Sequence, residues 1–278
     1  MMKMTGISAL AAAAAAPLAT AKADLPEAPA PLPTQPPGGS VPGPFLFADE
    51  FDGPFGAAPD PARWIVQDWQ DPVTPPVVGL YRNDRRNVFL DGNSNLVLCA
   101  TQEGPTYFSG KVLQNWRGQI NTTWEARIKF DCLFPGLWPA YWLLNQDPLP
   151  DGEIDIVEFY GNMSWPPGTT VHAASNGKTW EGWSIPQLVD GGWHTWRVYW
   201  GEDGFQFWRD YVDGAAPYFS VPAKPIKIHG RDESRWPFNA PGYWLQAIFN
   251  LAVGGSGGGD PRGGVYPSAM LIDYLRVW

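Results

Sequence analysis

The sequence predicts an all-β protein, a sandwich of many antiparallel strands with jelly-roll-like connections. Three observations predict this fold class. Short segments alternate apolar and polar residues with a period of two and are rich in β-branched and aromatic residues. Turn-forming residues interrupt these segments often, and the 30 Pro and 31 Gly leave little room for long helices. No segment keeps a helical period for more than about two turns.

The alternating segments recur along the whole domain. The clearest of them are 95–101, 124–130, 195–200, 204–209 and 270–278. Asp-Gly pairs, which favour tight turns, occur at Asp91-Gly92, Asp203-Gly204 and Asp213-Gly214. We expect the segments to be strands of two sheets packed face to face.

The glycine-rich run Gly254–Gly259 resembles a phosphate-binding loop only superficially. It lacks the Gly-Lys-Ser/Thr ending and the following helix that such a loop requires. We expect a flexible loop beside a cleft instead.

The N-terminal residues have the order of a secretory leader. Lys3 provides a positive charge, an apolar run extends from Ile7 to Ala19, and Ala21-Lys22-Ala23 fits a cleavage site. The run is too short for a comfortable membrane span. We therefore expect a signal peptide over 1–23, a secreted or cell-envelope protein, and no membrane span in the mature form. An uncleaved anchor is the alternative.

A linker and a single domain follow the leader. Residues 24–44 are mostly Pro, Ala and Gly and contain too little apolar surface to fold, so we expect an extended linker. Residues 45–278 are long enough for one large β-sandwich with its own core, and we expect this domain to be a monomer.

The charge and the aromatic content limit the class of partner. The net charge is -9 and the isoelectric point about 4.8, which disfavours nucleic acid. Neutral sugars are indifferent to this charge. The chain contains 16 Trp, whose flat faces can stack on sugar rings, although large sandwiches also bury Trp in their cores.

Cysteine and histidine give no metal signature. Export would permit a disulfide between Cys99 and Cys132, but a bridge and two buried thiols both remain open. The histidines His172, His194 and His229 are too scattered in the sequence to indicate a zinc site.

The most informative segment is Asp151–Tyr160, which contains three acids after Asp151. Glu153 and Asp155 are two residues apart and share one face of a strand, while Ile154 and Ile156 face the core. Strict alternation would put Glu158 on the isoleucine face. A one-residue bulge near Ile156-Val157 would return it to the acid face, and such bulges are common beside active sites.

This arrangement suits glycoside hydrolysis. The Cα atoms of the two glutamates would be about 13 Å apart, and their side chains could bring the carboxyl groups to roughly 5 Å, the separation of a retaining glycosidase. Crowding of three acids favours keeping one proton for general acid catalysis. The alternative is a solvated acidic face on an ordinary strand. Repulsion between neighbouring acids, the aromatic run Gly136–Trp142 and the expected export argue against it.

The segment Glu153-Ile-Asp155-Ile-Val-Glu158 resembles the signature of glycoside hydrolase family 16. The resemblance extends over nearly all of residues 45–278. The other matching segments are 47–53, 109–111, 136–144, 250–255 and 270–277.

The resemblance implies a fold, a chemistry and a substrate class. The family fold is a curved antiparallel β-sandwich, a concanavalin A-like jelly roll with a cleft on its concave face. Glu153 would be the nucleophile, Glu158 the acid/base, and Asp155 a neighbour that tunes the nucleophile, with no catalytic cofactor. The two-residue gap Ile156-Val157 resembles the bulged branch of the family, and the flanking motifs resemble laminarinases. The resemblance thus implies a retaining endo-β-1,3-glucanase acting on laminarin-type polysaccharide.

Four residues resemble the family's substrate-binding residues. Trp138 and Trp142 resemble its sugar-stacking tryptophans, His172 the histidine on the next strand, and Asn250 a residue of the cleft wall. Packing within a sheet is the alternative for each of them.

The resemblance also implies a structural calcium ion. The positions that match its ligands are Glu50, Gly92 and Asp273, and oxygen ligands are those that calcium prefers.

The loops depart from the family pattern and leave alternatives open. Extra tryptophans at Trp165, Trp180 and Trp183 could form sugar subsites or could block the cleft. A catalytically silent carbohydrate-binding or surface-antigen protein on the same fold is therefore one alternative. A galactan-cutting relative that uses the same acids is another.

Overall fold

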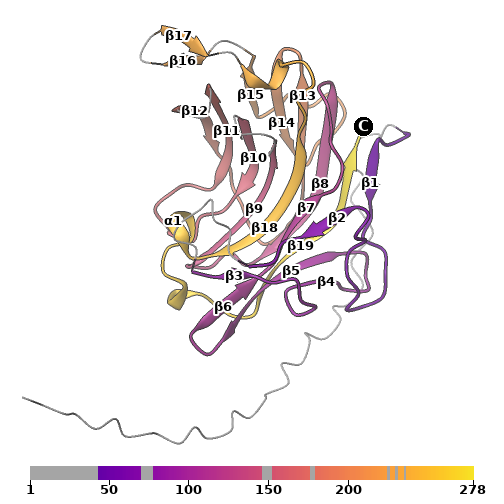
Figure 1. Cartoon of the computed structure of the whole chain (residues 1–278), viewed down its shortest axis with the longest axis vertical. Helices are drawn as coiled ribbons and strands as arrows, with labels where there is room; N and C mark the ends of the chain where they lie inside the picture. Colours follow the sequence, from indigo (N-terminus) through magenta and orange to yellow (C-terminus); the bar gives the residue numbers. More distant parts are fainter. Residues whose placement is uncertain are drawn as a thin grey trace, which may run out of the picture.

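The computed structural model describes residues 43–69, 78–145, 152–175, 179–223, 226–228, 231–234 and 236–278. The expected signal peptide, residues 1–23, and nearly all of the linker expected over 24–44 lie outside the described residues. Figure 1 shows two large curved sheets stacked as layers. No helix in the part of the chain that the structure describes has the length and apolar character to cross a membrane.

The larger sheet has ten strands within these ranges. Its order is β15-β14-β13-β8-β19-β5-β6-β3, with β1 beside β19 and β4 beside β5. Pairing is antiparallel except between β3 and β6. The bounds are β1 Phe47–Asp49, β3 Leu80–Tyr81, β4 Val88–Leu90, β5 Leu96–Glu103, β6 Thr106–Ser109, β8 Thr122–Asp131, β13 Trp193–Gly201, β14 Gly204–Arg209, β15 Phe219–Pro222 and β19 Ser268–Val277.

The second sheet has seven strands over the same described residues, in the order β12-β11-β10-β9-β18-β7-β2. Its bounds are β2 Trp64–Val66, β7 Lys111–Gln114, β9 Leu137–Leu144, β10 Gly152–Glu158, β11 Gly168–Ser175, β12 Thr179–Pro186 and β18 Gln246–Val253. A small hairpin and three short helical turns complete the elements: β16 Ile226–Ile228, β17 Arg231–Ser234, η1 Pro237–Asn239, α1 Gly255–Gly258 and η2 Pro261–Gly263.

The strands expected from sequence periodicity are confirmed. The five clearest alternating segments coincide with β5, β8, β13, β14 and β19. Asp91-Gly92 lies between β4 and β5, and Asp213-Gly214 lies between β14 and β15. Asp203 lies between β13 and β14, and Gly204 is the first residue of β14. The all-β sandwich predicted from the sequence is therefore the fold of the protein.

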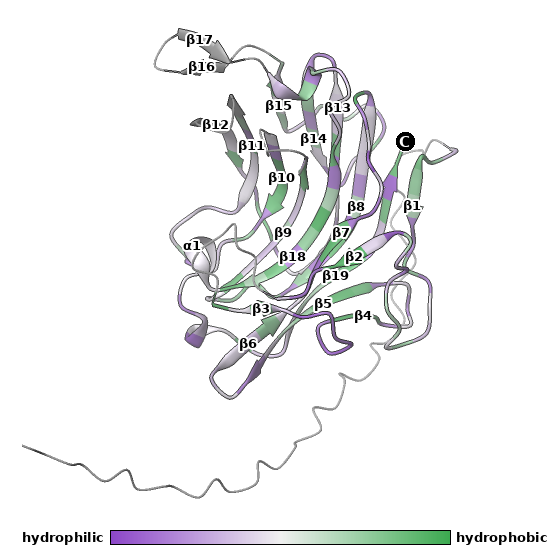
Figure 2. Ribbon diagram, in the orientation of Figure 1, coloured by the Kyte–Doolittle hydropathy of each residue, from purple (hydrophilic) through white to green (hydrophobic). Residues whose placement is uncertain are grey.

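Apolar side chains from the two sheets form one main core between the layers. Trp124 of β8 stacks on Trp200 of β13 with ring centroids 6.2 Å apart, and Tyr141 of β9 stacks on Phe249 of β18 at 4.7 Å. Figure 2 shows hydrophobic residues along β5 and β18. Ile154 of β10 joins the same core, so the opposite face of β10 is left for polar residues.

Both cysteines are free thiols buried in different apolar clusters. Cys99 lies inside β5 and packs with Phe89 and Val97, whereas Cys132, just after β8, belongs to the main core. Burial raises the pKa of the Cys99 thiol to about 11. Of the two alternatives left open by the sequence, the structure shows the pair of buried thiols.

The expectation of a flexible loop over Gly254–Gly259 is wrong. Residues Gly255–Gly258 form the single helical turn α1. A Cβ atom on Gly257 would lie 2.5 Å from Cδ2 of Trp138, so only glycine lets the turn approach this indole. The run provides close packing, which its composition alone does not distinguish from flexibility.

An ionic cluster links the start of β13 to the end of β14. Nδ1 of His194 lies 2.6 Å from Oδ2 of Asp210, and Nε2 lies 2.9 Å from Oδ1 of Asp190. The hydrogen bond with Asp210 raises the pKa of His194, although partial burial and the charge of Arg209 oppose this. A backbone hydrogen bond from Gly192 and the contact with His194 lower the pKa of Asp190.

Replacing His194 with glutamine removes its charged contacts with the aspartates and is expected to destabilise the fold near pH 5–6. The loss should be only about 0.5–1 kcal/mol, because the aspartates are partly exposed to water. A histidine with a raised pKa stabilises the native state fully below its unfolded pKa and loses this effect as the pH rises through its folded pKa. The difference in Tm between wild type and variant should therefore shrink above about pH 7. Calorimetry across pH measures this, and a difference that grows with pH would contradict it.

Candidate active site

A bulge in β10 gathers the three acids on one face. On β9, Trp142 lies opposite Asp155, but the next partner, Tyr141, lies opposite Val157, so Ile156 has no partner. The pairing with β11 shifts at the same place. The bulge expected near Ile156-Val157 is thus confirmed. Both of its residues are fully buried, and Glu158 joins Glu153 and Asp155 on the other face.

The acids are withdrawn from water and repel one another. Asp155 is 4% exposed and Glu158 is 7% exposed. Burial and the charge of Asp155 raise the pKa of Glu153 well above its usual range, while His172 and Lys111 oppose the shift. Burial and the charge of Glu158 raise the pKa of Asp155. Burial and mutual repulsion therefore both favour the protonated forms in this group, and a general acid needs such a retained proton.

Glu158 has a hydrogen-bond donor on each carboxylate oxygen. Nε1 of Trp138 donates to Oε1 over 2.8 Å, and the hydroxyl of Tyr160 donates to Oε2. Burial raises the pKa of Glu158, and these two donors oppose the shift because they stabilise the charged form. The sequence prediction missed Tyr160. Its position two residues after Glu158, on the same face by alternation, is the signal that could have found it.

His172 of β11 lies beside the acids, as expected. It is the register partner of Glu153, and its Nε2 lies 3.2 Å from Oδ2 of Asp155. Oxygen and nitrogen atoms of Glu153, Asp155 and His172 lie within 4.8 Å of one another, close enough to share a cation. The same proximity places a proton donor or a positive charge beside two carboxylates that would otherwise repel each other.

The remaining predicted binding residues are linked to one another. Nε1 of Trp142 donates to Oδ1 of Asn250 over 2.7 Å, and Asn250 donates in turn to the carbonyl oxygen of Trp138 at 3.4 Å. Nζ of Lys111, on β7, lies 5.2 Å from the ring centroid of Trp142. The structure thus brings Trp138, Trp142, His172 and Asn250 to one region, and their contact with sugar stays a prediction.

A small pocket adjoins Glu158 through Tyr160. It has a volume of about 190 Å³, and its lining includes Trp165 of the loop after β10, Thr170 of β11 and Ser184 of β12. Trp165 is 47% exposed and meets Tyr160 edge to face, with ring centroids 5.3 Å apart. An exposed indole beside hydroxyl groups has the character of a sugar subsite.

The other two loop tryptophans differ from Trp165. Trp183 packs against Trp236 with ring centroids 5.8 Å apart and borders the main core. The side chain of Trp180 lies outside the described residues. Of the extra tryptophans, the described part of the chain therefore shows Trp165 in the position of a candidate subsite.

The residues expected to hold calcium carry other contacts. Arg276 donates two hydrogen bonds to the Glu50 carboxylate, at 2.9 and 2.8 Å, and Arg127 donates one to Asp273 at 2.6 Å. Gly92 lies in an exposed turn. Two guanidinium charges already neutralise these carboxylates, so the donor set as it stands fits a divalent cation poorly. Calcium at this position stays a prediction from the resemblance.

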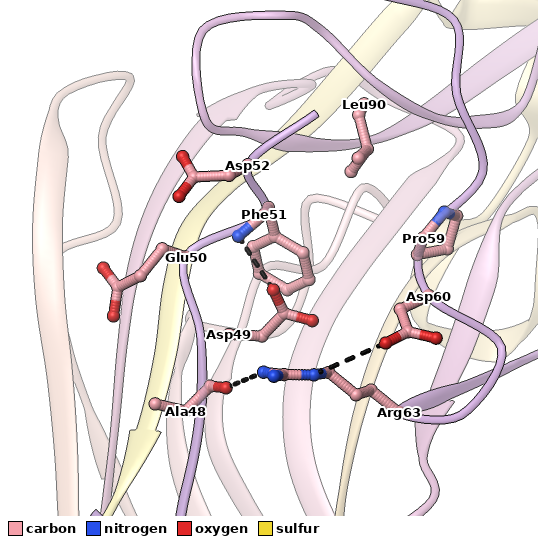
Figure 3. A pocket seen from close by; sticks show the side chains of 9 residues that line it. All are labelled: Ala48, Asp49, Glu50, Phe51, Asp52, Pro59, Asp60, Arg63 and Leu90. Atoms are coloured by element: carbon pink, nitrogen blue, oxygen red, sulfur yellow. Dashed lines mark hydrogen bonds and ion pairs between the residues drawn. The ribbon is translucent and has the colours of Figure 1, made fainter. Parts of the chain in front are cut away.

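Glu50 lines a different hollow from the acid site. This pocket, of about 420 Å³, lies where β1 ends, and Figure 3 shows its acidic side chains. Asp49 is held by the backbone N–H of Phe51 and by the indole of Trp64. Arg63 points between Asp60 and the carbonyl oxygen of Ala48. The side chains of Asp49 and Arg63 are thus held by other residues of the same chain.

Comparison with known proteins identifies close relatives. The family model for glycosyl hydrolases family 16 matches residues 81–224. A crystal structure of an immunostimulatory antigen and pseudo β-1,3-glucanase of Mycobacterium tuberculosis is 56% identical, with a TM-score of 0.78, covering 85% of this chain and 99% of that one. A β-1,3-glucanase of Mycobacterium marinum is 55% identical, with a TM-score of 0.76 and the same coverage of both chains.

A curated relative is more distant and much longer. The glucan endo-1,3-β-glucosidase A1 of Niallia circulans is 27% identical over 264 residues, which cover 84% of this chain. The chain spans 37% of the length of that relative.

Proposed function

The chain belongs to glycosyl hydrolases family 16, and on this basis we propose that it is an exported, retaining endo-β-glycanase that hydrolyses laminarin-type β-1,3-glucan. The observation that carries the proposal is the bulge of β10, which presents Glu153, Asp155 and Glu158 together on one face. The names of two relatives, a glucan endo-1,3-β-glucosidase and a β-1,3-glucanase, support the substrate class.

In the first step, Glu158 donates its proton to the glycosidic oxygen. The bond between this oxygen and the anomeric carbon breaks, and a carboxylate oxygen of Glu153 bonds to the carbon. The shortened chain leaves as an alcohol. Burial raises the pKa of Glu158 and favours the protonated form that this step needs.

In the second step, Glu158 acts as a base. Its carboxylate takes a proton from a water molecule whose oxygen attacks the anomeric carbon, and the bond to Glu153 breaks. Both acids return to their starting forms. Asp155 lies between the two glutamates on the same strand face, and its contact with His172 fixes its orientation.

A second candidate is a carbohydrate-binding protein without turnover. It is favoured by the Mycobacterium tuberculosis relative, which is described as a pseudo β-1,3-glucanase. The three acids are present in this chain, so loss of an acid would not be the cause of silence here.

We expect the full-length protein to release reducing ends from laminarin, and Glu158→Gln to lower this rate by at least about a hundredfold because the general acid is removed. Mixed-linkage glucan, agarose and a galactan complete the substrate panel and identify the linkage. Glu202→Gln, in the exposed turn between β13 and β14, is the matched control and should retain full activity. Binding of a glucan with no new reducing ends from any polymer would favour the second candidate.

A further inference from the structure

We propose that Tyr160 is a positioning residue that holds Glu158 as a carboxylate, which slows the acid-catalysed first step and favours the base-catalysed second step. This inference rests on the proposed function, because it assigns Tyr160 a role toward the acid/base of that reaction. Its basis is the hydroxyl of Tyr160, which donates a hydrogen bond to Oε2 of Glu158.

The two donors on Glu158 are permanent. The indole N–H of Trp138 does not titrate. Burial and the charge of Glu158 raise the pKa of the Tyr160 hydroxyl, so this phenol keeps its proton throughout the working pH range. Both oxygens of Glu158 therefore accept hydrogen bonds, and a hydrogen bond to a charged carboxylate is stronger than one to the neutral acid.

Several other charged or titratable groups lie near Glu158 and also influence whether it is protonated. Asp155 and Glu153 lie on its own strand face and favour the neutral form through repulsion, since charge on one acid opposes charge on the next. His172 comes from β11 and favours the charged form. Lys111 comes from β7 and acts on Glu153. None of these groups depends on the hydroxyl of Tyr160.

The tyrosine hydroxyl can be removed without disturbing the aromatic packing. The Tyr160 ring lies 6.1 Å from the ring of Trp138 and 5.3 Å from that of Trp165, measured between centroids. Phenylalanine retains both ring contacts and loses the donor. The substitution Tyr160→Phe therefore isolates the hydrogen bond.

The two half-reactions respond to this loss in opposite directions. Protonation of the leaving oxygen needs neutral Glu158, whereas activation of water needs its carboxylate. In Tyr160→Phe, the alkaline limb of kcat/KM on laminarin should move up by about one pH unit, so that kcat/KM rises on this side of the profile by up to about tenfold. A dinitrophenyl β-laminaribioside, whose departure needs no acid, should show the acid limb of kcat moved up by about one pH unit.

The matched control is Tyr266→Phe. The Tyr266 hydroxyl donates to the backbone carbonyl of Pro261 over 3.0 Å, so its hydrogen-bond acceptor is a peptide oxygen and not a carboxylate. Both pH profiles of this variant should coincide with those of wild type. Equal displacement in both variants would assign the effect to a general change in the fold and overturn the inference.

An infrared titration separates failure of this inference from failure of the proposed function. The carbonyl stretch of protonated Glu158, identified by its absence in Glu158→Gln, should persist to a pH about one unit higher in Tyr160→Phe than in wild type. An unchanged midpoint would overturn the inference whether or not the protein is active. A shifted midpoint without turnover of either substrate would support the stabilisation of the Glu158 carboxylate by Tyr160, but it would overturn the assigned effect on the two half-reactions and refute the hydrolase proposal.

Discussion

Replacing Glu153 with glutamine is expected to lower laminarin hydrolysis by roughly a thousandfold or more, because the amide forms no covalent glycosyl intermediate. The loss should appear in kcat, since the shape of the site is retained. The variant should also be at least as stable as wild type. Burial and the charge of Asp155 both disfavour the ionised form of Glu153, so a neutral side chain removes an unfavourable charge.

Azide distinguishes a nucleophile from a residue that only supports the site. In Glu153→Gly, the small anion can occupy the space of the lost side chain and attack the anomeric carbon directly. The expected product of an activated glycoside is an azide of inverted configuration, detected by nuclear magnetic resonance. Rescue of Glu158→Gly but not Glu153→Gly with this product would show that the two roles are assigned the wrong way round.

Replacing Glu125 with glutamine is expected to lower the free energy of unfolding by roughly 3 kcal/mol. Glu125 is 4% exposed and accepts hydrogen bonds from Arg197 at 2.7 Å and from the hydroxyl of Tyr274 at 2.9 Å. The Arg197 guanidinium also lies over the rings of Tyr211 and Trp278. Loss of the carboxylate leaves this buried positive charge uncompensated in the larger sheet, away from the acid site.

Urea denaturation measures this cost, and two variants define its origin. In the double variant with Glu125→Leu and Arg197→Met, the loss should be smaller than for Glu125→Gln alone, because no charge stays buried. Asp131→Asn breaks an exposed ion pair with Lys129 and should change the free energy of unfolding by about 0.5 kcal/mol or less. Equal losses for the exposed and the buried pair would refute the argument from burial.

The sequence predicted those parts of the site that local periodicity determines. Alternation along β10 places Glu153 and Asp155 on one face, and the position of Glu158 then requires the bulge that the structure shows. Lys111 could not be predicted in the same way. It approaches Trp142 because β7 and β9 both pair with β18, and no local pattern reports a register between strands so far apart in the chain.

Two other differences have simple physical reasons. Glycine-rich composition fits both a mobile loop and a tightly packed turn, and the approach of Gly257 to Trp138 depends on tertiary contacts. Tyr160 was missed because the acid signature names only carboxylates, although Tyr160 lies in the same segment, two residues after Glu158. Its hydroxyl gives Glu158 a hydrogen-bond partner that the acid motif itself does not contain.

The bulge at Ile156-Val157 also bears on how such a sequence can change in evolution. Both residues lie in the core, so loss of one codon here would leave one apolar residue between Asp155 and Glu158. Strict alternation would then keep all three acids, and Tyr160 beyond them, on their present face. The bulge absorbs the extra residue and so restores the alternation of side chains. A one-codon deletion at this place would change the spacing of the acids without changing the face on which they lie. Elsewhere in β10 the same deletion would reverse the facing of every residue on one side of it.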